Sequence, residues 1–332
     1  MKGYAQYSKF RAGTWFLGCL AAGLLGATVA MAQGDFPGNK PITIIVPFPP
    51  GGGTDILTRM VSEELSRNLS VPVLVENRPG GNTVVAAQAV ARAKPDGHTI
   101  LTSISSTMTM NPHLYDKLPY DPKKDFAPVT LASSMPLVLA VHPEFPAKTL
   151  PEFTALLKQN PGKYSYAYGA TPAQVLGEVY RAKAGVDIQG ISYNGSAPAQ
   201  NDVMGGHVPI IADALTPALA QLKANRLHPI AVSSAKRSQA LPDVPALSEA
   251  GLEGVDIADW TGFLVPAGTP QATIDKLHNA FAAALNTPKI RQQLESLGQT
   301  VYAVPGPEFQ KRIDRDYEVY GEVIRSAGIK LD

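Results

Sequence analysis

Cysteine, charge and long apolar runs are all scarce in this chain of 332 residues. A single cysteine excludes a scaffold held together by disulfides. Charged residues are only 17% of the chain, against about 25% in ordinary globular proteins. With 45% apolar residues, the composition nevertheless excludes long disorder, collagen and coiled coil. The length is that of about two globular domains.

The net charge of +1 is set by the N-terminus, because residues 1–32 hold Lys2, Lys9 and Arg11 and no acid. The remainder is therefore slightly acidic. A nearly neutral chain lacks the basic stripe expected of a nucleic-acid binder, so we expect no nucleic-acid partner. Any anion that binds must be held by local geometry.

The N-terminus has the three parts of a secretory signal. The basic residues precede an apolar run over 14–30, which ends in Ala30-Met31-Ala32. This pattern predicts a signal peptide over 1–32, cleavage before Gln33 and a periplasmic mature chain. A retained membrane anchor and a lipoprotein modified at Cys19 stay open as alternatives, although the run is short for a span of about 20 residues.

Short apolar runs alternate with helical patterns along the rest of the chain. Strands are expected at 42–46, 71–76, 99–103, 137–141, 164–167, 188–192, 208–212 and 229–233, and helices at 54–69, 83–93, 150–159, 173–184, 197–204 and 215–224. Further helices are expected around 274–285, 289–297 and 309–324. Alternating strands and helices predict parallel sheets with right-handed crossovers. The fold class is therefore α/β.

Two such sheets predict two lobes. Phe126–Ser134 and Trp260–Pro266 are the best candidates for strands that cross between them. We therefore expect one lobe over 33–134 plus 263–332, with the terminal helices returning to it, and a second lobe over 135–262.

The loop Pro47–Asp55 is the strongest candidate site. Three consecutive glycines, Gly51 to Gly53, let the backbone approach a ligand, and Thr54 can cap the helix that follows. The start of that helix offers free N–H groups to an oxyanion. A phosphate-binding P-loop is excluded, because Thr54-Asp55 stands where that motif needs Lys followed by Ser or Thr. A dinucleotide-binding motif is excluded as well, because Ile56 occupies the position of its third glycine. Asp55 is expected to bond backbone N–H groups and shape the loop.

Other loops have weaker signals. Tyr193–Ala199 and Tyr168–Pro172 follow strands and begin helices, and Thr102–Thr107 is rich in hydroxyls. Each alone is more typical of a plain helix cap. Asp213 ends an apolar strand, where a buried carboxylate needs donors from a ligand or from the backbone.

Enzyme signatures are missing from the sequence. It has neither G-x-S-x-G nor H-E-x-x-H, and its six histidines have no metal-ligand spacing. We expect no enzyme activity, no catalytic residues, no metal and no cofactor.

Several motifs resemble those of the Bug family, the solute-binding proteins of tripartite tricarboxylate transporters. The resemblance is carried by Pro41–Asp55, Glu76–Gly81, Pro95–Thr99, Tyr193–Gly195 with Pro198-Ala199, Leu241–Pro245, Glu249–Leu252, Trp260–Gly262 and Pro266–Pro270. It implies a two-lobed periplasmic binding fold (type II-like) whose lobes close on a carboxylate and deliver it to a membrane permease.

The resemblance also implies ligand contacts through backbone amides, hydroxyls and ordered water. Carried over to this sequence, the ligand-binding residues are Phe48, Gly52, Gly53, Thr54, Asp55, Ser103, Ser105, Thr107, Gly169, Thr171, Asn194, Gly195, Ala199 and Asp213. One loop departs from the family, since Gly169–Gln174 has Pro172, which removes a donor, where serines and a histidine are usual.

The sequence thus predicts a receptor for a small organic carboxylate, which we expect to act as a monomer. The ligand is left open among di- and tricarboxylates, aromatic carboxylates and amino acids. Two other functions stay open: an exported α/β hydrolase, and a ligand-presenting sensor for a membrane kinase.

Overall fold

The computed structural model describes residues 36–252, 257–328 and 330. The predicted signal peptide and the bond before Gln33 lie outside the described residues. The chain divides into a unit up to Phe36 and a unit over Pro37–Asp332, and the fold below is that of the second unit. None of the described helices is long and apolar enough to cross a membrane.

The first sheet begins with three parallel strands in the order β2-β1-β3. Their bounds are β1 (Ile42–Val46), β2 (Val73–Asn77) and β3 (Thr99–Ile104), with α1 (Gly53–Leu69) and α2 (Val84–Ala91) as crossovers. The strand β9 (Ala258–Pro266) pairs antiparallel with β3 and with β4 (Phe126–Val141), and β10 (Thr300–Pro305) pairs with β4. The predicted parallel arrangement of the first three strands is confirmed.

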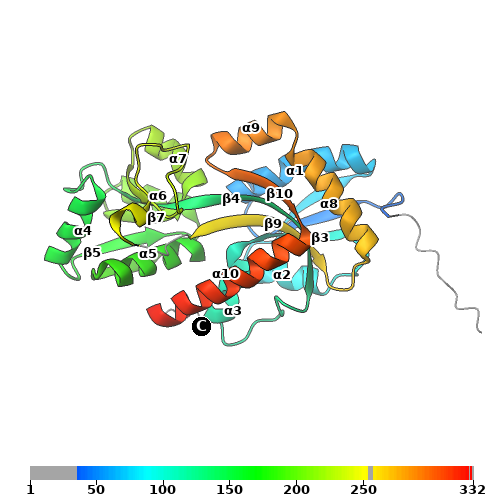
Figure 1. Cartoon of the computed structure of the whole chain (residues 1–332), viewed down its shortest axis with the longest axis horizontal. Coiled ribbons are helices and arrows are strands. Elements are labelled where there is room, and N and C mark those ends of the chain that lie inside the picture. The colour runs from blue at the N-terminus through cyan, green and yellow to red at the C-terminus, as the bar shows by residue number, and fades with distance from the viewer. Residues whose placement is uncertain (1–35, 253–256, 329, 331–332) are drawn as a thin grey trace, which may run out of the picture. The chain divides into compact units, whose positions relative to one another are not determined.

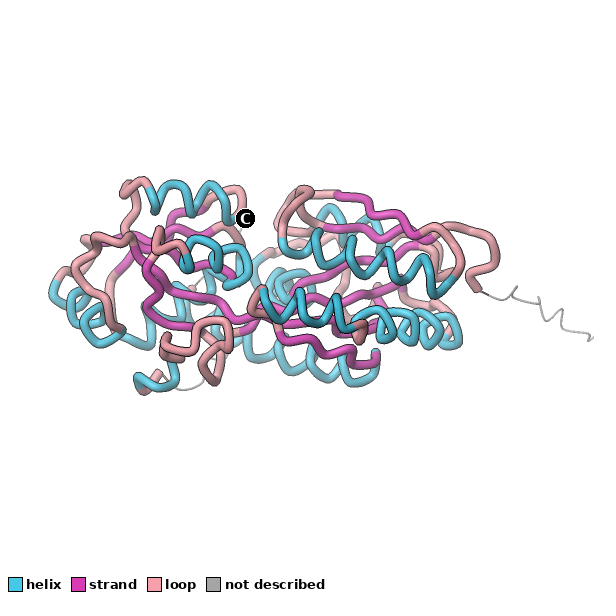
Figure 2. Tube along the Cα trace, turned by 90° about the horizontal axis from the view of Figure 1, so that it is seen from above, coloured by secondary structure: helices cyan, strands magenta, loops and turns pink. Residues whose placement is uncertain are grey.

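The second sheet is built around β5 (Tyr164–Tyr168), which is parallel to both β6 (Ile188–Ser192) and β7 (Ile210–Ala214). The end of β4 pairs antiparallel with β7 and with β8 (His228–Val232). Its helices are α4 (Leu150–Gln159), α5 (Thr171–Ala184), α6 (Ser196–Met204) and α7 (Leu215–Lys223). Figure 2 shows strands with helices on either side in both groups.

One strand belongs to both sheets. β4 pairs with β9 as far as Pro136 and with β7 from Leu137 onward. The two strands predicted at 126–134 and 137–141 are therefore one strand of 16 residues, which confirms the crossing at the first position. The chain returns to the first sheet at the second predicted position, since Ile257 donates to the carbonyl of Ser233 after β8 and β9, which follows directly, pairs with β3 and β4. Together the two sheets give the two-lobed fold expected from the sequence.

The C-terminal helices are α8 (Gln271–Leu285), α9 (Pro288–Ser296) and α10 (Gly306–Ala327). Phe309 and Ile313 of α10 pack in the core beneath the first sheet. Tyr320 and Ile324, further along the same helix, pack in the core of the second lobe. Figure 1 shows α10 in red, extending toward α5. This helix therefore touches both cores, and the lobe boundaries stay a prediction.

Short helices near β3 and after β8 were not expected. A π-helix, η1, spans Ser106–Met110 and leads into α3 (Asn111–Leu114), and a 3-10 helix, η2, spans Leu247–Ala250. The expected cap of α1 is also wrong. Gly52 occupies the N-cap position and Thr54 lies inside the first turn, so the hydroxyl stands two residues too late to cap the helix.

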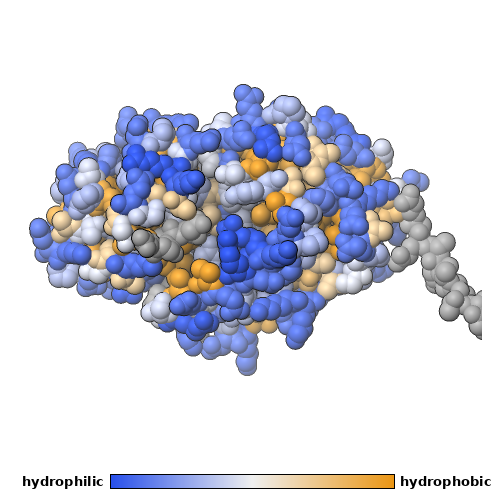
Figure 3. All heavy atoms as spheres, in the orientation of Figure 1, coloured by the Kyte–Doolittle hydropathy of each residue, from blue (hydrophilic) through white to orange (hydrophobic). Residues whose placement is uncertain are grey.

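The face in Figure 3 is mostly hydrophilic, with apolar residues in small groups. Such scattered apolar residues are normal for a soluble surface.

Candidate functional site

Among the described helices that lack a side-chain cap, four follow β1, β5, β6 and β7. Their N-cap residues are Gly52 for α1, Ala170 for α5, Gly195 for α6 and Ala214 for α7. The first N–H groups of a helix have no partner within it and carry partial positive charge. At α4, in contrast, Thr149 and Glu152 form a complete capping box. The backbone N–H groups at the starts of α1, α5, α6 and α7 are therefore not bonded by a capping side chain.

Asp55 organises the loop before α1, as predicted. Its carboxylate accepts a hydrogen bond from the backbone N–H of Gly51 at 2.9 Å and from Asn77 Nδ2 at 2.8 Å. Arg59 Nε lies 3.0 Å from its Oδ2. Burial raises the pKa of Asp55, but the bonds from Arg59, Gly51 and Asn77 outweigh burial and hold the pKa below its usual value. Asn77 also donates to the carbonyl of Phe48, which ties both ends of the loop together.

This triglycine loop lies against the second lobe. A Cβ added at Gly53 would lie 3.4 Å from Cγ2 of Thr216, in the first turn of α7. Thr216 in turn donates to the carbonyl of Leu297, just after α9, at 3.0 Å. The starts of α1 and α7, one from each lobe, are therefore neighbours.

Two loops of the second lobe approach so closely that glycine is required. A Cβ at Gly169 would lie 2.2 Å from the backbone carbonyl carbon of Gly195. Any side chain at position 169 would therefore clash unless the backbone moved. Gly195 itself has φ +104, a conformation that L side chains rarely adopt. The loops before α5 and α6, both predicted to bind the ligand, are thus held side by side.

Asp213 is buried just before α7, and its partners among the described residues are all neutral donors. It accepts from Ser196 Oγ at 2.6 Å, from Gln200 Nε2 at 2.8 Å and from the backbone N–H of Ala214 at 2.9 Å. Burial raises its pKa to about 6, although these three bonds lower it in part. The carboxylate therefore fixes α6 relative to α7.

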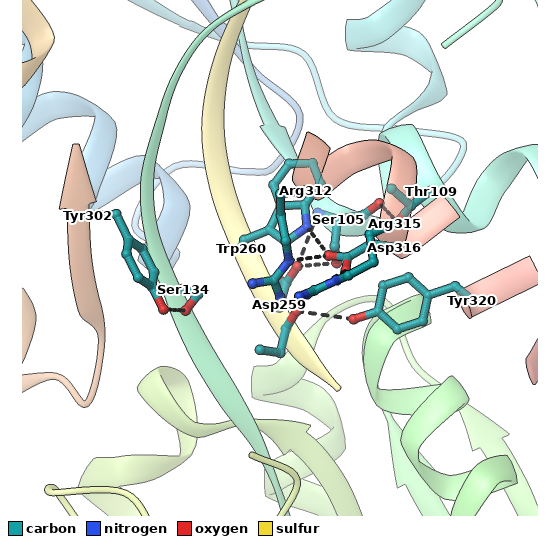
Figure 4. A network of polar contacts seen from close by, with 11 residues as sticks. Ser105, Thr109, Ser134, Asp259, Trp260, Tyr302, Arg312, Arg315, Asp316 and Tyr320 are labelled. Carbon is teal, nitrogen blue, oxygen red and sulfur yellow. Dashed lines mark hydrogen bonds and ion pairs between the residues drawn. The ribbon is translucent and has the colours of Figure 1, made fainter. Parts of the chain in front are cut away.

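The hydroxyl groups that follow β3 are largely engaged within the protein. Ser105 donates to Asp259 at 2.6 Å, and Thr107 donates to Thr83 at 2.8 Å. Figure 4 shows Asp259 beside a second buried carboxylate, Asp316, on α10. Burial raises the pKa of Asp259 to about 6, offset in part by the bonds from Ser105.

Asp316 ties α10 to the start of β9. Its carboxylate accepts from Trp260 Nε1 at 3.0 Å, from Arg312 at 2.6 Å and from Arg315 at 2.9 Å (Figure 4). Ser134 on β4 donates to the hydroxyl of Tyr302 at 3.2 Å on the other side of that strand. These contacts fix the region in which β4 passes from one sheet to the other.

The predicted site residues differ in what they can offer a ligand. Ser103 is buried and donates to the carbonyl of Ile104. Ala199 is completely buried in the core of the second lobe, so its methyl group faces protein, whereas Asn194 is exposed. Thr171, the first residue of α5, is buried.

Four residues near these loops were missed by the sequence analysis. Asn82 donates to Thr171 across the lobes, and Thr216 lies close to the triglycine loop. Asp259 holds Ser105, and the Oγ of Ser106 is buried with no hydrogen-bond partner among the described residues. Ser106 was within a run recognised for its hydroxyls, but the other contacts depend on packing between distant segments.

With this geometry in hand, the chain can be compared with known proteins. Residues 57–329 match the family described as "Tripartite tricarboxylate transporter family receptor". The chain belongs to this family. The Bug resemblance is confirmed as well: BugT of Bordetella pertussis is 31% identical over 88% of this chain and 90% of its own length.

Solved structures of family members and relatives support the same assignment. A periplasmic transporter has 39% identity and a TM-score of 0.83, covering 90% of this chain and all of its own. Rpa4515 of R. palustris, solved with adipate, is 29% identical with a TM-score of 0.83, and covers 89% of this chain and 99% of its own. MatC of Rhodopseudomonas palustris, with bound malate, is 31% identical with a TM-score of 0.78. The match covers 87% of this chain and 100% of the MatC chain. The family receptor thus has the periplasmic binding protein fold.

Proposed function

We propose that this receptor is a periplasmic protein that captures a small organic carboxylate between its two lobes and delivers it to the permease of a tripartite tricarboxylate transporter. Two similar structures carry adipate and malate, both of which are dicarboxylates. The role involves binding, lobe closure and release, with no chemical step.

The single observation that best supports the proposal is the set of uncapped helix starts on neighbouring loops of both lobes. α1 contributes one start from the first lobe, and α7 lies near it, since a Cβ added at Gly53 would lie 3.4 Å from Thr216 Cγ2. Helix N-termini favour anions by about 0.3–2 kcal/mol each, so several must act together to reach micromolar affinity, about 8 kcal/mol. Arg59 is engaged by Asp55 and Asn77, so backbone donors and hydroxyls are the principal anchors.

The proposal includes all the ligand-binding residues predicted from the sequence. For some of them, the structure limits which atoms could contact the ligand. Because its methyl group is in the core, Ala199 would contribute only its backbone. Asp55 and Asp213 would act mainly by shaping loops, since their oxygens already accept hydrogen bonds. The buried, unpartnered hydroxyl of Ser106 joins the candidates.

The proposal includes the predicted processing and architecture. Export would remove residues 1–32, and ligand would close lobe 33–134 plus 263–332 on lobe 135–262 by shifting an existing equilibrium. A monomer suffices for this role. Mass spectrometry of protein recovered from the periplasm should give a chain that begins at Gln33. A mass that retains the leader would contradict the processing step alone.

A thermal-shift screen tests the ligand class. Exported protein would be mixed with malate, adipate, citrate, benzoate and glutamate, and any compound that raises the melting temperature would then be titrated by calorimetry. We expect one carboxylate to bind with a stoichiometry of one and to be recovered unchanged. Conversion of the bound compound would instead favour the hydrolase alternative.

A double substitution, Gly52→Val with Gly53→Val, tests the first-lobe loop. There is room for a Cβ at both positions. The nearest atom would lie 3.9 Å from a Cβ added at Gly52 and 3.4 Å from a Cβ added at Gly53. We therefore expect a folded protein whose first-turn N–H groups are covered and whose affinity falls at least tenfold. The control is Ala182→Val, at an exposed position of α5. Unchanged affinity in the double variant would remove this loop from the site.

A further inference from the structure

Asn82, between β2 and α2, is held in an uncommon backbone conformation. Its φ is +50 and that of Thr83 is +78, so two successive residues other than glycine occupy the left-handed region. Such conformations cost free energy and persist only where neighbours hold them. Here Asn111 Nδ2 donates to the carbonyl of Asn82 at 2.8 Å, and Thr107 donates to Thr83 Oγ1 at 2.8 Å.

The orientation of the Asn82 amide follows from its partners. Because Asn111 uses its Nδ2 on the carbonyl of Asn82, its Oδ1 is left as an acceptor. Asn82 Nδ2 donates to that oxygen at 2.9 Å. The second hydrogen of the same Nδ2 is donated to Thr171 Oγ1. One NH₂ group therefore contacts α3 of the first lobe and α5 of the second.

We infer that Asn82 is a positioning residue that joins the lobes: its amide holds Thr171, and with it the start of α5, against the first-lobe loop whether or not ligand is present. This inference rests on the proposed function. At the neighbouring approach of the lobes, the Thr216 atom nearest to a Cβ added at Gly53 is the methyl carbon Cγ2, which cannot form a directional hydrogen bond. A hydrogen bond between lobes biases the open and closed populations, and the apparent affinity follows the fraction in the binding-competent state.

The test compares Asn82→Gly, Thr171→Val and the double variant. Glycine tolerates the positive φ at position 82, so this change removes the amide with little backbone strain. Thr171→Ser keeps the hydroxyl that accepts the bond from Asn82, so its lobe separation and its affinity should match those of the wild type. The control is Asn160→Ala, which removes a bond to Leu156 within the second lobe.

Lobe separation can be measured without ligand. Spin labels at Glu63→Cys on α1 and Ala182→Cys on α5, both exposed, report the distance between lobes. The only natural cysteine is Cys19, which a chain that begins at Gln33 does not contain. We expect Asn82→Gly to move the ligand-free distance distribution toward longer values, and Thr171→Val to do the same.

Affinity provides the second measurement, with malate and adipate as probes. Loss of one hydrogen bond should raise Kd roughly three- to tenfold. The double variant should be no worse than Asn82→Gly alone, because that change already removes the bond to Thr171 together with the bond to Asn111. Multiplicative effects, or an unchanged distance distribution in Asn82→Gly, would overturn the inference. Failure of the wild type to bind any carboxylate would count against the proposed function, whereas the ligand-free distances would still decide the role of Asn82.

Discussion

The loops of the two lobes use a buried carboxylate in opposite ways. In the first lobe, Asp55 is paired with Arg59 and its pKa is lowered. In the second lobe, Asp213 has only neutral donors and its pKa is raised to about 6. The first loop is therefore held by a permanent charge, whereas the second is held by a group whose charge depends on pH near neutrality.

The two loops also differ in how tightly they are packed. A Cβ at Gly52 would find its nearest neighbour at 3.9 Å, whereas one at Gly169 would lie 2.2 Å from the backbone of Gly195. Glycine in the first loop leaves backbone open to a ligand, and glycine in the second lets two pieces of backbone touch. The same residue type therefore leaves open space in one lobe, where we propose that ligand binds, and allows close packing of backbone in the other.

The largest contrast is expected between Gly169→Ala and Gly52→Ala. The first change forces the loops before α5 and α6 apart and should lower the free energy of unfolding by roughly 3 kcal/mol, the upper part of the usual range for overpacking. The second should leave stability within about 0.5 kcal/mol of wild type. Urea unfolding at pH 7 measures both, and equal losses would refute the difference in packing.

A pH series separates the two carboxylates. Because the pKa of Asp213 is raised, the folded state binds the proton more tightly than the unfolded state, and stability falls as pH rises from about 4 to about 6. Asp213→Asn removes this loss, so the variant should gain on the order of 2 kcal/mol relative to wild type between pH 4 and pH 7.

Asp55→Asn should show the opposite sign. With a lowered pKa, the contribution of Asp55 is present above the unfolded value of 3.8 and is lost as pH falls through the folded pKa. This variant should therefore lose stability relative to wild type as pH rises through the acid range, and then stay level. Urea unfolding between pH 3 and pH 7 tests both variants, with exposed Asp187→Asn as the control. Parallel pH profiles for Asp55→Asn and Asp213→Asn would contradict the comparison.

Local patterns predicted most of the fold. Alternating apolar runs and helix periodicity located the strands of both sheets apart from β10, which was not expected, since these patterns depend on neighbours in sequence. The role of Asp55 in its loop was predicted for the same reason, because Gly51 and Asp55 are four residues apart. The joining of two predicted strands into β4 could not be read from the sequence, because Pro136 in its middle resembles a strand end until β9 and β7 are seen on either side.

The parts of the site that the sequence did not reveal are contacts between distant segments. Asn82 meets Thr171 at a separation of 89 residues, and Ser105 meets Asp259 at 154. Neither pair has a spacing or motif that marks it. The cap assigned to Thr54 failed for a different reason: the glycines before it let α1 begin two residues earlier than the hydroxyl suggests.

The smallest expected effect comes from a matched pair of hydroxyls in the first turns of α1 and α6. Thr54 makes no side-chain hydrogen bond among the described residues, whereas Ser196 donates to Asp213 at 2.6 Å. Ser196→Ala should cost roughly 1–2 kcal/mol at pH 7, as expected for a bond to a charged acceptor, and less at pH 5, where Asp213 is mostly protonated. Thr54→Ala should cost no more than about 0.5 kcal/mol at either pH. If the cost of Ser196→Ala were the same at both pH values, the charge on Asp213 would not be what its hydrogen bonds stabilise, and the contrast between the two lobes would reduce to packing alone.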